Sequence, residues 1–192
     1  GTEGGSLTLA SGVSATESKT GTLSLSGEST KLATFDNING ASSGSLLVST
    51  GSSSASASGN TVISTGDSVN GRAGDISISP GASKATNGAD LILEGGDSTL
   101  AQPESKGGAV FVKSGSGSVG GDTSVSGGDG ESSSGGFVNI AGGESSAAAG
   151  RGGSVFVQGG LTKSTSSGGT VNLKGGMSTE STGGNVYISG GA

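Results

Sequence analysis

Cysteine, histidine and tryptophan are absent from this chain of 192 residues. Without cysteine there are no disulfides, and thiols give no information about the redox compartment. Without histidine and cysteine, the Ser-His-Asp and Cys-His catalytic arrangements and the usual zinc sites are excluded. We therefore expect a protein that is not an enzyme and needs no cofactor.

Basic charge is also scarce, since nine Lys and Arg stand against 15 Asp and Glu, for a net charge of -6. This balance disfavours binding to nucleic acid, whose phosphates need a basic surface, and it disfavours a basic amphipathic membrane anchor. No run approaches the ~18 apolar residues of a membrane span. The chain begins at Gly1 without a signal-peptide pattern, which we interpret as a processed form or an excerpt of a longer repeat array.

Aromatic residues make up 3% and apolar residues 29% of the chain, too few for a thick globular core. The 43 glycines and abundant serines are typical of a flexible, disordered tract. Random low-complexity sequence, however, does not keep apolar pairs in register over many copies. The sequence therefore favours a narrow repeat architecture over disorder.

The pattern Gly-x-h-x-h-x-x-Gly recurs in twelve copies, where h is mostly Val, Ile or Leu, and Ala89 and Glu28 each replace one glycine. We call the second h residue of each copy its anchor, and the commonest interval between anchors is 15 residues. Such a period with strand-type alternation is typical of an array whose copies must stack to bury their apolar faces. The anchors are Leu9, Leu25, Val48, Ile63, Ile78, Leu93, Val112, Val125, Ile140, Val157, Leu173 and Ile188.

The columns of this repeat predict its fold. Alternation directs the two h residues of a copy, such as Val110 and Val112, to one inner face. Nine copies have Ser or Thr five residues after the anchor, which predicts an inward hydroxyl bonded to backbone groups or to its ladder neighbours. Glycines recur four residues before and three residues after the anchor. At such positions we expect either a backbone with positive φ or two backbones that lie too close together for a Cβ. We predict an all-β fold, a parallel β-solenoid (β-helix) of about twelve short rungs without helices, as a single domain over residues 1–192.

Two intervals are longer than all the others. The 23-residue interval contains Lys31 to Ser43, with Phe35 and Ile38, and the 19-residue interval contains Thr99 to Lys106, with Pro103. Extra residues in a solenoid bulge out on one side, where they cover the stack or form a binding loop. We favour a surface bulge over a binding site.

Carboxylates are the remaining groups that could carry chemistry. Asp75/Asp90 and Asp129/Glu144 lie on neighbouring copies, at a predicted separation near that of a retaining glycosidase. The columns supply neither the aromatic platforms nor the basic cleft that a polysaccharide-acting site needs. Enzymatic activity is therefore disfavoured.

A calcium site is the second reading of the acidic residues. Asp67, Asp97, Asp129 and Glu144 directly follow the glycine three residues after the anchor. Calcium is coordinated by six to eight oxygen atoms. The nonapeptide repeat of calcium-binding β-rolls does not occur in this sequence. Hydrogen bonds within turns are the favoured role, and calcium binding by the acidic columns stays open.

The residue just before the anchor is predicted to point outward, and in half of the copies it is large and apolar. We expect this outward column to form a lateral contact with another chain. Neither end of the repeat has an atypical polar cap, so we also expect end-to-end stacking into a homo-oligomer or filament. The six candidate interface residues are Leu47, Val62, Ile92, Phe111, Phe156 and Tyr187.

The motif Gly-Gly-x-Val-x-Ile-x-Gly-Gly, present in the last copy as Gly183 to Gly191, resembles the glycine/serine-rich β-solenoid repeats of extracellular fibre and surface proteins. The resemblance implies a secreted or cell-surface, non-catalytic scaffold, with O-linked glycan possible on Ser/Thr-rich turns. An adhesin stalk or a carbohydrate-binding surface protein is a related reading. Ice-binding solenoids are the main alternative, but outward pairs such as Phe156/Gln158 replace their Thr-x-Thr arrays.

Overall fold

The computed structural model describes residues 6–12, 21–37, 40, 42–100, 102 and 105–191. Gly5, Ser14, Ile38 and Pro103, which the sequence patterns include, lie outside the described residues. The chain divides into two units, Gly1–Leu91 and Ile92–Ala192. The predicted single domain over residues 1–192 stays a prediction.

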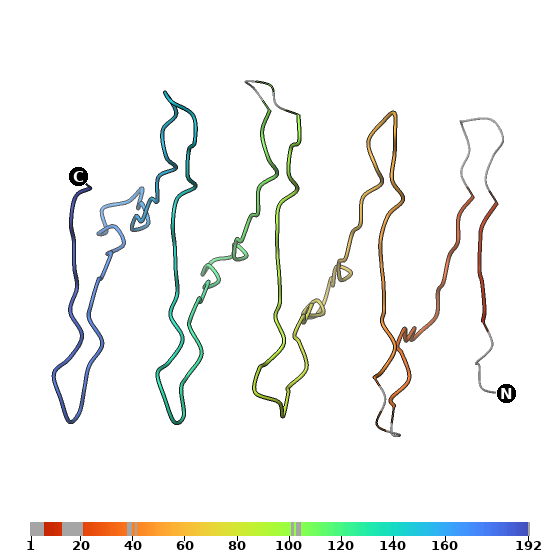
Figure 1. Ribbon diagram of the computed structural model, residues 1–192, viewed down its shortest axis with the longest axis horizontal. Helices are drawn as coiled ribbons and strands as arrows, with labels where there is room; N and C mark the ends of the chain where they lie inside the picture. Colours follow the sequence, from red (N-terminus) through yellow and green to blue (C-terminus); the bar gives the residue numbers. More distant parts are fainter. Residues whose placement is uncertain are drawn as a thin grey trace. The chain divides into compact units, whose positions relative to one another are not determined.

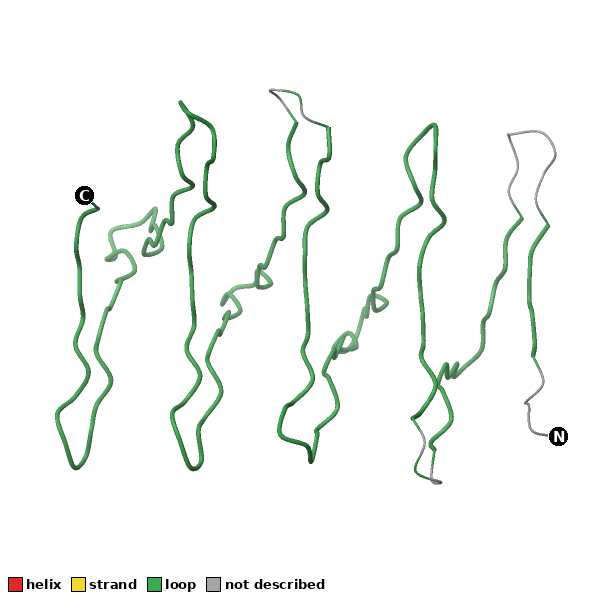
Figure 2. Ribbon diagram, viewed as in Figure 1, coloured by secondary structure: helices red, strands yellow, loops and turns green. Residues whose placement is uncertain are grey.

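The described residues contain no helix and no strand, so there are no element bounds to give. Figures 1 and 2 show the chain as extended segments joined by loops and bends. The predicted all-β fold, a parallel β-solenoid or β-helix, is therefore wrong. The physical reason is that a strand needs a ladder of hydrogen bonds to a neighbour, and the segments do not form one.

Most backbone hydrogen bonds in the described part occur instead at the bases of the connections between copies. The amide of Gly184 donates to the carbonyl oxygen of Gly176 at 2.9 Å, and that of Gly136 donates to Gly128 at 2.8 Å. Each bond joins the glycine four before an anchor to the glycine three after the previous anchor. The bond closes a loop, but among the described residues it is not followed by further hydrogen bonds that would pair the two segments as strands. The other loops closed in this way are 12–21, 96–108, 115–121, 143–153 and 160–169.

At some loop bases one glycine lies too close to a second backbone to carry a Cβ. A Cβ on Gly142 would clash with the carbonyl oxygen of Gly153, whereas a Cβ on Gly143 would meet nothing within 4 Å. Among the described residues only Gly40 has a positive φ, of 79°, and it belongs to none of the glycine columns. Close backbone approach accounts for Gly21, Gly108, Gly153 and Gly169 in the column four before the anchor. The described glycines three after the anchor meet nothing within 4 Å, so close approach is wrong for that column, and positive φ is wrong for the described glycines of both columns.

The Ser/Thr column lies at the loop tips. The hydroxyl of Ser178 accepts a hydrogen bond from the amide of Ser181 at 2.9 Å, and Ser68 accepts one from Gly71 at 3.1 Å. The prediction of a bond to backbone was right at these positions, but the predicted inward direction was wrong, because the residues are exposed. A hydroxyl that binds an amide two or three residues later initiates a turn. The same arrangement occurs at Ser53, Ser83 and Thr162.

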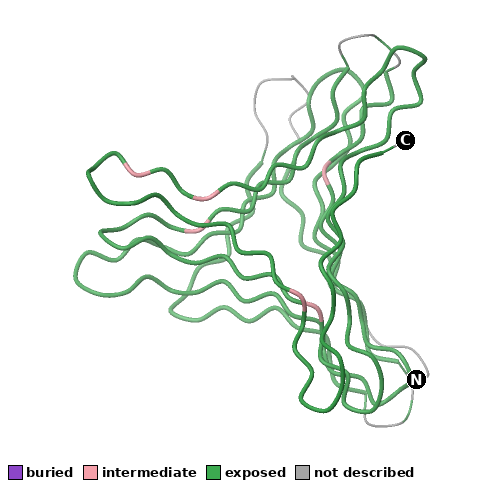
Figure 3. Ribbon diagram, turned by 90° about the vertical axis from the view of Figure 1, so that its left-hand side faces the viewer, coloured by how far each residue is buried: buried purple, intermediate pink, exposed green. Residues whose placement is uncertain are grey.

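No described residue is buried, as Figure 3 shows. The solvent-accessible surface is 19366 Å². A compact folded monomer of 17.7 kDa would expose about 7,900 Å², and its extended chain about 25,700 Å². One copy of this chain therefore leaves about three quarters of its extended surface in water.

The alternation nevertheless sorts the side chains by exposure. In one segment Val155 is 48% exposed, Phe156 93% and the anchor Val157 70%. The same order holds in the copies whose anchors are Val48, Val112 and Ile188. In each of them the first h residue is less exposed than the outward residue and the anchor that follow it. Sequence alternation thus predicts which side is more covered, although the coverage stops far short of a core.

Candidate assembly surface

The six residues of the outward column are all highly exposed, from 70% for Ile92 to 93% for Phe156. Leu47 and Val62 belong to the unit Gly1–Leu91, and the other four belong to Ile92–Ala192. Their exposure follows from the extended backbone, which alternates successive side chains between two faces. Each of these side chains is open to a partner.

The last copy shows the outward face in detail. Asn185 donates a hydrogen bond from Nδ2 to the Tyr187 hydroxyl oxygen at 2.9 Å. Residues two apart in an extended segment share a face, so this bond places Asn185 beside Tyr187. The Tyr187 hydroxyl oxygen accepts this hydrogen bond, and the aromatic ring stays exposed and able to pack against a partner.

Phe137 is an exposed aromatic residue that the outward column omits. It is 90% exposed and lies two residues before Asn139, the column position of its copy. Phe137 can be identified from the sequence, because side chains two residues apart in an extended segment lie on the same face. The residues one and three before an anchor therefore both point outward. Phe137 therefore belongs with the candidate interface residues.

Polar groups replace apolar ones at one loop base. Ser114 stands two residues after an anchor, where the neighbouring copies have glycine, and its hydroxyl bonds that of Thr123 across the loop 115–121. Thr123 stands where most copies have an aliphatic h residue. The pair joins two successive segments through side chains and offers no chemistry beyond that link.

The acidic residues do not gather into a site in the described part of the chain. Asp75 pairs with Arg72, with 2.7 Å between Oδ1 and Nη2, and both side chains are exposed. No group of three or more Asp or Glu side chains with a geometry able to hold a metal occurs among the described residues. A single exposed ion pair contributes little to stability.

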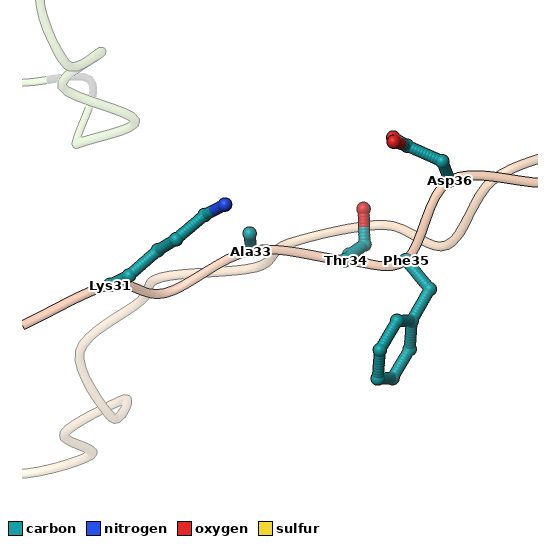
Figure 4. A pocket seen from close by; sticks show the side chains of 5 residues that line it. All are labelled: Lys31, Ala33, Thr34, Phe35 and Asp36. Atoms are coloured by element: carbon teal, nitrogen blue, oxygen red, sulfur yellow. The ribbon is translucent and has the colours of Figure 1, made fainter.

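A hollow of about 430 Å³ lies along the first long interval and is lined by a single short segment. Its lining contains Lys31, Ala33, Thr34, Phe35 and Asp36. Figure 4 shows the Phe35 ring pointing away from the Lys31 and Asp36 side chains, so these residues do not converge on one point. A ligand pocket encloses its ligand and directs polar groups at it. This hollow does neither, which agrees with a surface bulge.

Over the residues that the structure describes, no helix has the length and apolar character needed to cross a membrane. No protein-family model matches the chain, and comparisons with curated proteins and with solved structures also find no match. The functional argument therefore rests on the chain's own residues.

Proposed function

We propose that this chain is a non-catalytic structural subunit that assembles with copies of itself into an extracellular filament or surface fibre. The observation that carries the proposal is the absence of any buried side chain among the described residues, although apolar residues recur in every copy. Apolar surface in water is unfavourable by roughly 25 cal/mol per Å². Partner chains that cover this surface would lower the free energy of the system.

The outward column gives the assembly its contact residues. Phe111, Phe156 and Tyr187 are large, exposed and placed at the same position of their copies. Fully burying one such side chain contributes roughly 1.5–3 kcal/mol. Several of them together supply the apolar anchors of a lateral contact. The expected end-to-end stacking depended on solenoid rungs and is not part of this proposal.

We propose an extracellular location because the repeat resembles those of glycine/serine-rich fibre and surface proteins. The absence of cysteine and histidine supports a mechanical role over a catalytic one. Exposed Ser/Thr-rich loop tips are compatible with O-linked glycan, because the loops project polar groups into solvent.

Electron microscopy by negative staining, combined with light scattering over a concentration series, tests this function. We expect fibres above a critical concentration and a scattering signal that rises with them. Val62 and Val119 provide a matched pair, since Val62 lies in the outward column at 80% exposure and Val119 lies in a loop at 87%. Val62→Ser should raise the critical concentration, whereas Val119→Ser should leave it near the wild-type value. A chain that stays monomeric at every concentration tested would overturn the proposal.

A further inference from the structure

In the described part of the chain, the extended segments between the loops have backbone groups without a partner in the same copy. Between Gly153 and Gly160, for example, residues 154–158 make no backbone hydrogen bond in the structure. Folded proteins make about one hydrogen bond per residue, most of them between backbone groups. The segments are therefore open edges that a second backbone can pair with.

The composition of these segments suits strand pairing. Residues 137–141, 154–158 and 185–189 contain no charged side chain and no proline, and each combines an aromatic residue with two β-branched ones. β-Branched and aromatic residues favour a pleated, half-buried strand. Short uncharged segments of this kind form ladders when a partner is present.

From these observations, and on the basis of the proposed function, we propose that the partner of each extended segment is the backbone of a second copy of this chain. Strand structure then forms during assembly, by intermolecular hydrogen bonds along the segments, while the loops stay outside the contact. A single copy contains the groups of a β-sheet but not their partners.

The large exposed area of the chain favours a second copy as the partner. The chain exposes 19366 Å², about 11,000 Å² more than a compact monomer of its mass would. A standard interface buries about 1,600 Å² in total, so a single small contact would leave most of this excess exposed. A copy of the same chain carries the same spacing of segments and glycines, and can meet every segment in register.

Four lysines make the contact measurable by limited trypsin digestion of the full chain. Lys113 and Lys174 lie in segments, each directly after an anchor, whereas Lys84 and Lys163 lie at loop tips. All four are exposed in the single chain, so trypsin should cut at each of them below the critical concentration. Above it, we expect loss of cleavage at Lys113 and Lys174, continued cleavage at Lys84 and Lys163, and a gain of strand signal in circular dichroism.

A proline at Gln158 tests the backbone directly. Gln158 is polar and its amide is unbonded in the structure, so Gln158→Pro removes a donor for intermolecular pairing without breaking a backbone hydrogen bond of the single chain. Losing one ladder bond should raise the critical concentration by about 2- to 13-fold. Gln158→Ala, which keeps the amide, and Thr165→Pro, in a loop, should both assemble like the wild type.

The outcomes separate this inference from the proposed function. Fibres that form without strand signal, or with Lys113 and Lys174 still cut, would overturn the pairing of segments and leave the fibre function standing. Equal effects of Gln158→Pro and Thr165→Pro would also overturn it. A chain that never assembles would overturn both proposals.

Discussion

Replacing Phe156 with serine should weaken assembly without disturbing the single chain. The Phe156 side chain is 93% exposed, so the monomer loses almost no packing when the ring is removed. In the assembly, burial of the same ring contributes roughly 1.5–3 kcal/mol, and each 1.4 kcal/mol corresponds to a factor of ten. We therefore expect the critical concentration to rise about 10- to 150-fold for Phe156→Ser.

Phe35→Ser is the matched control for this prediction. Phe35 is 95% exposed but lies in the first long interval, outside the outward column. The critical concentration of each variant is measured by sedimentation of fibres and light scattering, with circular dichroism of the monomer as a check. A similar shift for both variants would show that general hydrophobicity, and not the outward column, drives assembly. No shift for Phe156→Ser would refute the role of this residue.

Three further outcomes follow from the loop bases, the loop tips and the net charge. Gly142→Ala should push the Gly153 backbone away and weaken the hydrogen bond from the Gly153 amide to the Gly143 carbonyl oxygen. Hydrogen exchange at the Gly153 amide should become about 2- to 13-fold faster, which is the equivalent of one hydrogen bond. Gly143→Ala should leave this exchange rate unchanged, because a Cβ there meets no other atom. Ser178→Ala should speed exchange at the Ser181 amide, Ser178→Thr should preserve protection there, and equal rates for the two variants would contradict the turn role. Because each copy carries a net charge of -6, added salt should screen repulsion and lower the critical concentration, and a scattering series in sodium chloride checks the sign.

Some local features could be predicted from single columns of the sequence. The alternation around Val157 correctly ranks its neighbours by exposure, because side-chain direction in an extended backbone depends only on position parity. The Ser/Thr column predicts a hydroxyl bound to backbone, as Ser178 shows. Close backbone approach at glycine is confirmed at Gly153, whose amide binds Gly143.

The candidate site was predictable in part. The position before the anchor identifies Phe111, Phe156 and Tyr187 as outward residues, and the structure shows them exposed. Phe137 was missed because only one outward position per copy was considered, although the same parity covers two. Whether these side chains meet a partner is a property of an assembly, and it stays a prediction.

The sequence is sufficient to predict where segments and loops alternate and which residues of a segment share a face. These are local properties of spacing and side-chain size. The three-dimensional structure was needed to show which glycines lie against a second backbone and that the segments, over the described residues, neither pair into a ladder nor bury their apolar side chains. The reason is that pairing and burial join segments from separate copies of the repeat, and a period of 15 residues does not specify whether the partner lies in the same chain.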